Sequence, residues 1–256
     1  MGLKAQQGQV NLEGTERIEI KSTDIGENYE LWVSLPFGYA QSTQTYKTLY
    51  VLDANVTFGM IRDIQTLMSF EPGNPPLIIV GIAYSGLNEW IGKRSRDYMA
   101  NQVATIPGSG GAGKYLSFLE SEVIPAIEKR YRATDERIIY GHSTAALFGY
   151  YSLAEKPDLF KGYILTSPSV DEDAGYTLAH MKEWVKPSTS KQIRVYTSVG
   201  TEEKMATQNA VAQLNTIMMA RQETALTYQF ENVKGTHMNS MAQSFINGLL
   251  FVNKVQ

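Results

Sequence analysis

The chain has 256 residues, a length that suits one α/β domain with a sizeable buried core, so we expect a single domain over residues 1–256. Its 23 Lys and Arg and 26 Asp and Glu give a formal charge of −3 and are scattered rather than gathered in runs, which argues against nucleic-acid binding. The sequence contains no cysteine, and this excludes disulfides, cysteine-based zinc sites and cysteine nucleophiles.

The N-terminal stretch MGLKAQQGQV contains no apolar run of the kind that marks a signal peptide. No stretch of the sequence is apolar over the length that a membrane-spanning helix needs. We therefore expect a soluble protein without membrane contacts, either cytoplasmic or exported with its signal peptide already removed.

Eight apolar or β-branched runs bounded by turn residues predict β-strands. The first two runs alternate between apolar and polar residues, whereas the middle ones, such as PLIIVGIAY at residues 76–84, are apolar almost throughout. Strands that are buried on both faces are typical of a parallel sheet covered by helices on both sides. The predicted strands are Glu16–Lys21, Tyr29–Leu35, Thr48–Leu52, Leu77–Ala83, Arg137–Tyr140, Gly162–Thr166, Ile193–Val199 and Leu226–Phe230.

Helical patterns separate most of these strands, which predicts a doubly wound α/β fold with a mostly parallel eight-stranded sheet. Two long connections, Ser85–Gly113 and Ser167–Lys191, contain at most a short helix and are expected to wall a pocket at the carboxyl ends of the strands. The predicted helices are Val56–Phe70, Lys114–Tyr131, Thr144–Glu155, Leu178–Val185, Glu203–Arg221 and Ser240–Asn253.

The stretch GSGGAGKY at residues 108–115 differs from the phosphate-binding loop G-x-x-x-x-G-K-[ST] by having Tyr115 at the hydroxyl position. A working loop follows a buried strand and offers a small hydroxyl to magnesium, but here the preceding segment is polar and contains a proline. We therefore favour a glycine loop that leads into an amphipathic helix over a nucleotide-binding site.

The stretch YGHSTAALFGYYSLA, residues 140–154, points more clearly to a chemical function. A strand runs into Gly141-His142-Ser143-Thr144-Ala145 and then directly into a helix, which is the context of the nucleophile elbow G-x-S-x-G. The turn needs small residues two before and two after the serine, because larger side chains would collide where the helix folds back on its strand. Gly141 meets this need fully and Ala145 approximately, so Ser143 is the predicted nucleophile.

A serine hydroxyl needs a base, and in this fold the partners follow in the chain order serine, acid, histidine. His237 lies after the last predicted strand, in KGTHMNSM, where the base is expected. Of the other two histidines, His142 is interpreted as a packing residue and His180 as a solvated residue of a helix. The three histidines are far apart in sequence, so no histidine-rich metal centre is predicted.

The acid should follow the strand Ile193–Val199, where VGTEE supplies two glutamates. We favour Glu203, because the third residue after the strand-ending glycine is the usual place for the acid. Glu202, and the aspartates Asp171 and Asp173 after the preceding strand, remain alternatives.

The negative charge that forms on an ester carbonyl during attack needs two backbone N–H donors. One is expected from Thr144, which follows the nucleophile, and one from Ala54 or Asn55 in the loop after the third strand. Asp53 closes that strand and is expected to brace the loop.

With these motifs in order, the chain resembles the putative-esterase family of α/β hydrolases, the group of enterobactin esterase-like hydrolases, esterase D and feruloyl esterases. The likeness covers nearly the whole chain and includes KTLYVLDAN, RSRDY, the elbow, LTSPSV, VGTEE and GTHMNSM. The resemblance implies the α/β-hydrolase fold and a Ser143, His237 and Glu203 triad, although some siderophore-hydrolysing members work with a serine–histidine pair. The chain departs from the family pattern at Ala145, at Ala54 and in VDED after SPS.

We interpret the protein as a serine carboxylesterase that works through an acyl-enzyme on a small-molecule ester and needs no cofactor. A siderophore trilactone esterase of the same fold and a catalytically silent binding protein are the alternatives. For Arg94 and Arg96, structural salt bridges with Asp97 or another acid are the alternative to substrate contacts. The sequence leaves the natural substrate and the oligomeric state open. The predicted substrate contacts are Arg94, Tyr98, Trp90, Trp184 and Tyr176.

Overall fold

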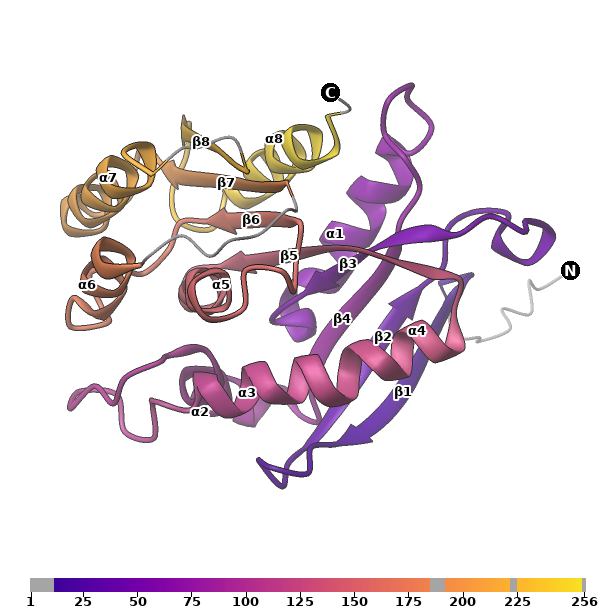
Figure 1. The fold of residues 1–256 in the computed structure, drawn as a ribbon, viewed down its shortest axis with the longest axis horizontal. Helices are drawn as coiled ribbons and strands as arrows, with labels where there is room; N and C mark the ends of the chain where they lie inside the picture. Colours follow the sequence, from indigo (N-terminus) through magenta and orange to yellow (C-terminus); the bar gives the residue numbers. More distant parts are fainter. Residues whose placement is uncertain (1–11, 185–191, 222–224, 255–256) are drawn as a thin grey trace, which may run out of the picture.

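The computed structural model describes residues 12–184, 192–221 and 225–254 (Figure 1). Its strands form one sheet in the order β1-β2-β4-β3-β5-β6-β7-β8. β1 pairs antiparallel with β2 and β2 antiparallel with β4, whereas the other neighbours are parallel. The prediction of a mostly parallel eight-stranded sheet is therefore confirmed. The strands are β1 (Thr15–Lys21), β2 (Asn28–Ser34), β3 (Tyr46–Val51), β4 (Ile78–Tyr84), β5 (Ala133–His142), β6 (Gly162–Thr166), β7 (Ile193–Gly200) and β8 (Leu226–Val233).

Helices cover both faces of the sheet, because the side chains of each central strand alternate between two separate cores. On β5, Ile139 joins one core while Ile138 and Tyr140 join the other. α1 (Ala54–Met68) and α8 (Met241–Asn253) pack in the second core, opposite α5 (Thr144–Glu155), as Figure 1 shows. The remaining helical elements are η1 (Tyr39–Gln41), α2 (Leu87–Tyr98), α3 (Ala112–Phe118), η2 (Leu119–Val123), α4 (Ile124–Arg130), α6 (Tyr176–Glu183) and α7 (Met205–Met219).

The predicted long connection Ser85–Gly113 is wrong, because the helix α2 occupies its first half. The glycine loop that follows is bound back onto the end of this helix: the Gly111 N–H donates to the Arg96 carbonyl at 2.8 Å, and the Ala112 N–H donates to Met99. Tyr115 is fully buried, and its ring packs against Phe148. These contacts give the glycine loop a structural role and occupy the N–H groups of Gly111 and Ala112 within the protein.

The predicted helix Lys114–Tyr131 is present as one helical run with a π-helical turn, η2, between α3 and α4 (Figure 1). Pro125 lies at the start of α4 and has no N–H to continue the α-helical hydrogen bonds, which accounts for the widened turn just before it. The predicted helix Leu178–Val185 corresponds to α6, and its last residue lies outside the described ranges, as does the N-terminal stretch 1–10.

Within the described ranges, the helices all fall short of the length and apolar character needed to cross a bilayer. The continuous sheet supports the expectation of a single domain over residues 1–256, which stays a prediction.

Candidate active site

The residues singled out from the sequence gather at one edge of the sheet. β3, β5, β6, β7 and β8 are parallel neighbours, so their carboxyl ends lie side by side. Ser143 follows β5, Glu203 follows β7 and His237 follows β8. The fold thus brings together three side chains that are separated by up to 94 residues in sequence (237 − 143).

Ser143 sits on the sharp turn between β5 and α5. Its backbone angles, φ 62° and ψ −125°, lie in a region that residues other than glycine rarely adopt. The turn is held by a hydrogen bond from the Ser143 N–H to the Thr166 carbonyl of β6, at 3.0 Å. Ala145 is fully buried, so the chain accommodates the extra methyl group that replaces the second elbow glycine. This is the strained strand–turn–helix geometry expected of a nucleophile elbow.

Gly141 is the elbow residue that the packing makes least replaceable. A Cβ added there would lie 2.5 Å from the Ala145 carbonyl oxygen, and both groups are backbone-fixed. We expect Gly141→Ala to lower the free energy of unfolding by about 1–3 kcal/mol, as overpacking does elsewhere. Urea denaturation measures this change.

Gly59 is the matched control, because it lies in the middle of α1 with no atom within 4 Å of an added Cβ. Gly59→Ala should raise the free energy of unfolding by roughly 0.5–1 kcal/mol through helix propensity. Equal effects at the two positions would show that the elbow does not require glycine.

His237 and Glu203 form the closest polar pair at this edge. The Nδ1 atom of His237 lies 2.7 Å from Oε2 of Glu203. The Glu203 side chain is 2% exposed and the His237 side chain 36% exposed, so the carboxylate is buried behind an imidazole that faces the solvent. A buried carboxylate at Nδ1 fixes the ring orientation and the tautomer, and it leaves Nε2 free to exchange a proton.

Two further donors hold the Glu203 carboxylate in place. Its Oε1 accepts hydrogen bonds from the Ser167 hydroxyl at 2.6 Å and from the Gly200 N–H at 2.7 Å. Burial alone would raise the pKa of Glu203, but the hydrogen bonds from His237, Ser167 and Gly200 outweigh it and lower the pKa below its ordinary value. Glu203 is therefore held as a carboxylate. Ser167, which was not predicted from the sequence, has a backbone φ of 46° and contributes its hydroxyl to this site.

The alternative acids have other surroundings. Glu202 is exposed, and Asp171 accepts a hydrogen bond from Thr207 at 3.1 Å. Asp173 is buried and binds the Gly175 and Thr177 N–H groups at the start of α6. The geometry at His237 therefore singles out Glu203 among the candidates.

The hydroxyl of Ser143 opens onto a cavity of about 180 Å³. Its Oγ lies 2.9 Å from Oγ of Ser169, which is its hydrogen-bond partner within the described ranges. The described residues contain no cluster of three or more His, Asp or Glu that could hold a metal ion. The cavity is lined by Ser143, Ser169, Glu172, Glu203, Lys204, Thr207 and His237.

The ring of His142 packs against the imidazole of His237. The centres of the two rings lie 4.6 Å apart, and Nδ1 of His142 lies 2.9 Å from the Thr166 hydroxyl. Burial, together with the neighbouring His237, lowers the pKa of His142 to about 3, so this ring is neutral. The contact fits the interpretation of His142 as a packing residue.

The predicted oxyanion donors lie at the first turns of two helices. Thr144 begins α5 and Ala54 begins α1, and the N–H groups of Ala54, Asn55 and Thr144 have no acceptor in the part of the chain that the structure describes. Free N–H groups are normal at helix N-termini and suit the binding of negative charge. The side chain of Asn55 exchanges two hydrogen bonds with the backbone of Tyr84, which ties α1 to the end of β4.

The alanine at position 54 is accommodated by a glycine on the neighbouring strand. A Cβ added at Gly81 would lie 2.8 Å from the Ala54 Cβ, so the methyl group fills the space that Gly81 leaves. The substitution of the usual family glycine by Ala54 therefore fits the packing of β4 and α1.

None of the predicted substrate contacts is among the described residues that line the cavity at Ser143. Tyr98 is fully buried, Trp184 is 7% exposed, and Trp90 and Arg94 bind Asp53. The alternative of a structural salt bridge describes both arginines, since Arg96 pairs with Asp97. These residues were expected to line a pocket because the segment was predicted as a loop. In the structure it is the helix α2, and the face that carries Trp90, Arg94 and Tyr98 contacts Asp53.

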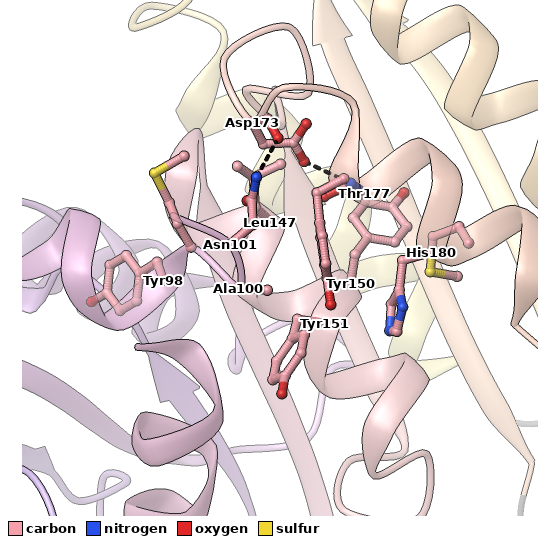
Figure 2. Close-up of a pocket in the computed structure, with 12 residues that line it drawn as sticks. Tyr98, Ala100, Asn101, Leu147, Tyr150, Tyr151, Asp173, Thr177 and His180 are labelled. Carbon is pink, nitrogen blue, oxygen red and sulfur yellow. Dashed lines mark hydrogen bonds between the residues drawn. The ribbon is translucent and has the colours of Figure 1, made fainter. Parts of the chain in front are cut away.

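Tyr176 lines a different and much smaller cavity. Figure 2 shows this cavity, which lies between the end of α2, α5 and α6. The ring of His180 lies between Tyr151 and Tyr176, and the Asn101 side chain donates to the Asp173 carbonyl at 3.0 Å. This cavity has a volume of about 10 Å³, close to the least that one water molecule needs, so it is too small for a substrate.

Comparisons with known proteins agree on the fold and the family. A sequence profile described as "putative esterase" matches residues 22–250. The chain is 30% identical over 186 residues to the ferri-bacillibactin esterase BesA of Bacillus subtilis, and 28% identical over 170 residues to a siderophore triacetylfusarinine C esterase of Aspergillus fumigatus. These alignments cover 67% and 63% of this chain and 64% and 58% of the relatives, less than two thirds of either relative.

Solved structures resemble the whole described fold. The BES protein from Bacillus cereus superposes with a TM-score of 0.91 at 23% identity, covering 99% of this chain and 100% of that one. The siderophore hydrolase EstB from Aspergillus nidulans superposes with a TM-score of 0.83 at 23% identity, covering 96% of both chains. The α/β-hydrolase fold predicted from the sequence is confirmed.

Proposed function

Because this chain belongs to the putative-esterase family of α/β hydrolases, we propose that it is a serine hydrolase that cleaves carboxylic esters through an acyl-enzyme. The proposal depends mainly on the hydrogen bond of 2.7 Å between Glu203 and His237. Both residues line the same cavity as Ser143, which lies at the strained elbow. This is the arrangement by which a weak nucleophile becomes reactive at neutral pH.

In the proposed reaction, Oγ of Ser143 attacks the ester carbonyl carbon and its proton moves to Nε2 of His237. The negative charge on the carbonyl oxygen is stabilised by the N–H groups of Thr144 and of Ala54 or Asn55. Collapse of this intermediate expels the alcohol, which takes the proton from His237 and leaves an acyl-enzyme. A water molecule then repeats the sequence, releasing the carboxylic acid and restoring Ser143.

Among the described residues, the Ser143 hydroxyl has Ser169 as its hydrogen-bond partner. The two Oγ atoms lie 2.9 Å apart and either hydroxyl can donate, whereas the proposed reaction requires the Ser143 proton to point toward Nε2 of His237. Hydrogen bonds of catalytic groups are often loose without a substrate and tighten in the complex.

We propose siderophore esters as the substrate class, because two relatives are described as esterases of ferri-bacillibactin and of triacetylfusarinine C. A general carboxylesterase is the second candidate, favoured by the cavity itself. Its charged lining residues include one cation, Lys204, and two acids, Glu172 and Glu203, so it has no excess of positive charge with which to attract an anionic ferric complex.

A substrate panel tests the proposal. The protein is assayed with bacillibactin, triacetylfusarinine C, p-nitrophenyl acetate and p-nitrophenyl butyrate, after titration of the active serine with a fluorophosphonate. We expect rapid labelling and a kcat/KM for one siderophore at least about 100-fold above that for p-nitrophenyl acetate, since contacts remote from the ester raise this ratio. A labelled protein with a higher kcat/KM for the p-nitrophenyl esters than for either siderophore would support the general carboxylesterase. A protein that is neither labelled nor active would be a silent binding protein.

A further inference from the structure

One face of α2 encloses Asp53. Trp90, Arg94 and Tyr98 are spaced four residues apart and therefore lie on the same side of this helix. Trp90 Nε1 donates to Asp53 Oδ1 at 2.7 Å, and the Arg94 guanidinium contacts both carboxylate oxygens at 2.7–3.1 Å. The Tyr98 hydroxyl accepts the backbone N–H of Asp53 at 3.1 Å. Both the carboxylate and the N–H of Asp53 are thus held by α2.

The same guanidinium also reaches the helix that follows the nucleophile. Nη1 of Arg94 donates to the Thr144 hydroxyl at 3.0 Å. Asp53 immediately precedes Ala54, and Thr144 immediately follows Ser143, so Arg94 links the two helix starts that carry the proposed oxyanion donors. A guanidinium is planar and its donors point in fixed directions, so it sets the distance between the two groups that it joins.

Both linked turns have unusual backbone conformations that need support. Asp53 has φ 54° and Ser143 has φ 62°, in the left-handed region that side chains other than glycine rarely adopt. Such conformations persist where the surrounding contacts determine them, and they concentrate at functional sites. The Asp53 and Arg94 side chains are 5% and 13% exposed, so water competes little with this link.

The engagement of Arg94 leaves it little capacity to bind a substrate anion. Nε, Nη1 and Nη2 all donate within the protein, and the central guanidinium carbon lies over the Trp90 and Tyr98 rings, 5.2 Å and 5.7 Å from their centres. A group committed in this way fits a role in holding the site together.

We propose that Arg94 is a positioning residue that holds the N–H groups of Ala54 and Thr144 at the spacing an oxyanion requires. The proposal rests on the proposed ester hydrolysis. Through Arg94, α2 would then affect catalysis although, within the described residues, it forms no hydrogen bond to Ser143 or His237.

The test compares Arg94→Lys with Arg96→Lys. Arg96 lies on the same helix and forms its own ion pair with the buried Asp97, and its hydrogen bonds do not include Asp53 or Thr144. For each protein, kcat and KM for p-nitrophenyl acetate and the inhibition constant of a trifluoromethyl ketone are measured per site titrated with a fluorophosphonate. The ketone forms a tetrahedral adduct and therefore reports on the oxyanion donors.

We expect Arg94→Lys to lower kcat by about 10- to 100-fold with KM changed by less than about 3-fold. Displaced oxyanion donors stabilise the charged transition state less, but they hardly affect binding of the neutral ground-state ester. The ketone should bind more weakly by a similar factor. Arg96→Lys should leave all three constants within about 2-fold of the wild type, because Arg96 bonds to Glu27, Tyr29 and Asp97 and not to the turns that carry the proposed oxyanion donors.

Thr144→Val provides a second variant that keeps the Asp53–Arg94 pair and the shape of residue 144 but removes the hydroxyl that accepts from Arg94. It should lower kcat and ketone affinity together, by a smaller factor than Arg94→Lys. A purely structural role would reduce the titrated fraction and leave the constants per site unchanged.

The outcomes separate this inference from the proposed function. An active wild type in which both Arg94→Lys and Thr144→Val retain normal constants per site would overturn the positioning role alone. A raised KM with unchanged kcat in Arg94→Lys would also overturn it, by assigning the side chain to substrate binding. A wild type that is neither labelled nor active would overturn the proposed function and, with it, this inference.

Discussion

Ser143→Ala is expected to abolish ester hydrolysis while leaving the fold intact. The substitution removes the only atom that can form the acyl-enzyme in the proposed reaction, and loss of a serine nucleophile elsewhere costs on the order of 10⁶-fold in kcat. Residual hydrolysis of roughly 10³-fold over water can remain, because the oxyanion donors persist. The measurement is kcat for p-nitrophenyl acetate, with far-ultraviolet circular dichroism to follow folding.

Ser117→Ala is the control for this substitution. Its hydroxyl lies on the exposed side of α3 and donates to the Gly113 carbonyl at 3.1 Å, far along the chain from the elbow. It should retain the wild-type kcat. Retained turnover and fluorophosphonate labelling in Ser143→Ala would mean that another residue is the nucleophile, with Ser169 the first to examine because its Oγ lies 2.9 Å from that of Ser143.

Glu203→Gln should lower kcat by about 10³- to 10⁴-fold, because an amide in place of the carboxylate favours the wrong histidine tautomer. The bond to His237 Nδ1 at 2.7 Å places the substituted atoms directly against the ring. KM should change little, since Glu203 contacts the base rather than the substrate. Steady-state kinetics on p-nitrophenyl acetate provide both constants.

Glu202→Gln and Asp171→Asn serve as controls for the choice of acid. Glu202 is adjacent in sequence but exposed, and Asp171 binds Thr207. Both should retain nearly full activity. A nearly normal Glu203→Gln enzyme together with an impaired control would move the acid to that residue, whereas three nearly normal variants would indicate a serine–histidine pair.

The sequence was sufficient for the parts of the fold that depend on apolar pattern. The eight strands followed from β-branched runs bounded by turns, and each was found within a few residues of its predicted bounds. Glu203 was chosen by its position after a strand-ending glycine, and in the structure that glycine N–H binds the Glu203 carboxylate. In both cases the residues that determine the structure lie close together in the sequence, so one short stretch was enough for the prediction.

The helix α2 could not be predicted in this way. Its inner face carries Arg94 alongside Trp90 and Tyr98, and the partners that make a buried arginine acceptable, Asp53 and Thr144, lie 41 and 50 residues away in the sequence. A helix is recognised in a sequence by the regular spacing of its apolar residues, and a buried face that contains an arginine lacks this spacing. Ser167 was missed for a similar reason, since its role depends on a hydrogen bond to a residue 36 positions later.

The bond between the Ser143 and Ser169 hydroxyls has a kinetic consequence. Pointing the Ser143 proton toward His237 involves side-chain torsions, movements that take picoseconds to nanoseconds in exposed residues. Enzymes of this size turn over in milliseconds to seconds, so the rotation is at equilibrium throughout each catalytic cycle. The contact with Ser169 therefore affects only how often the Ser143 proton points toward His237, and it does not limit the rate of turnover in the proposed reaction.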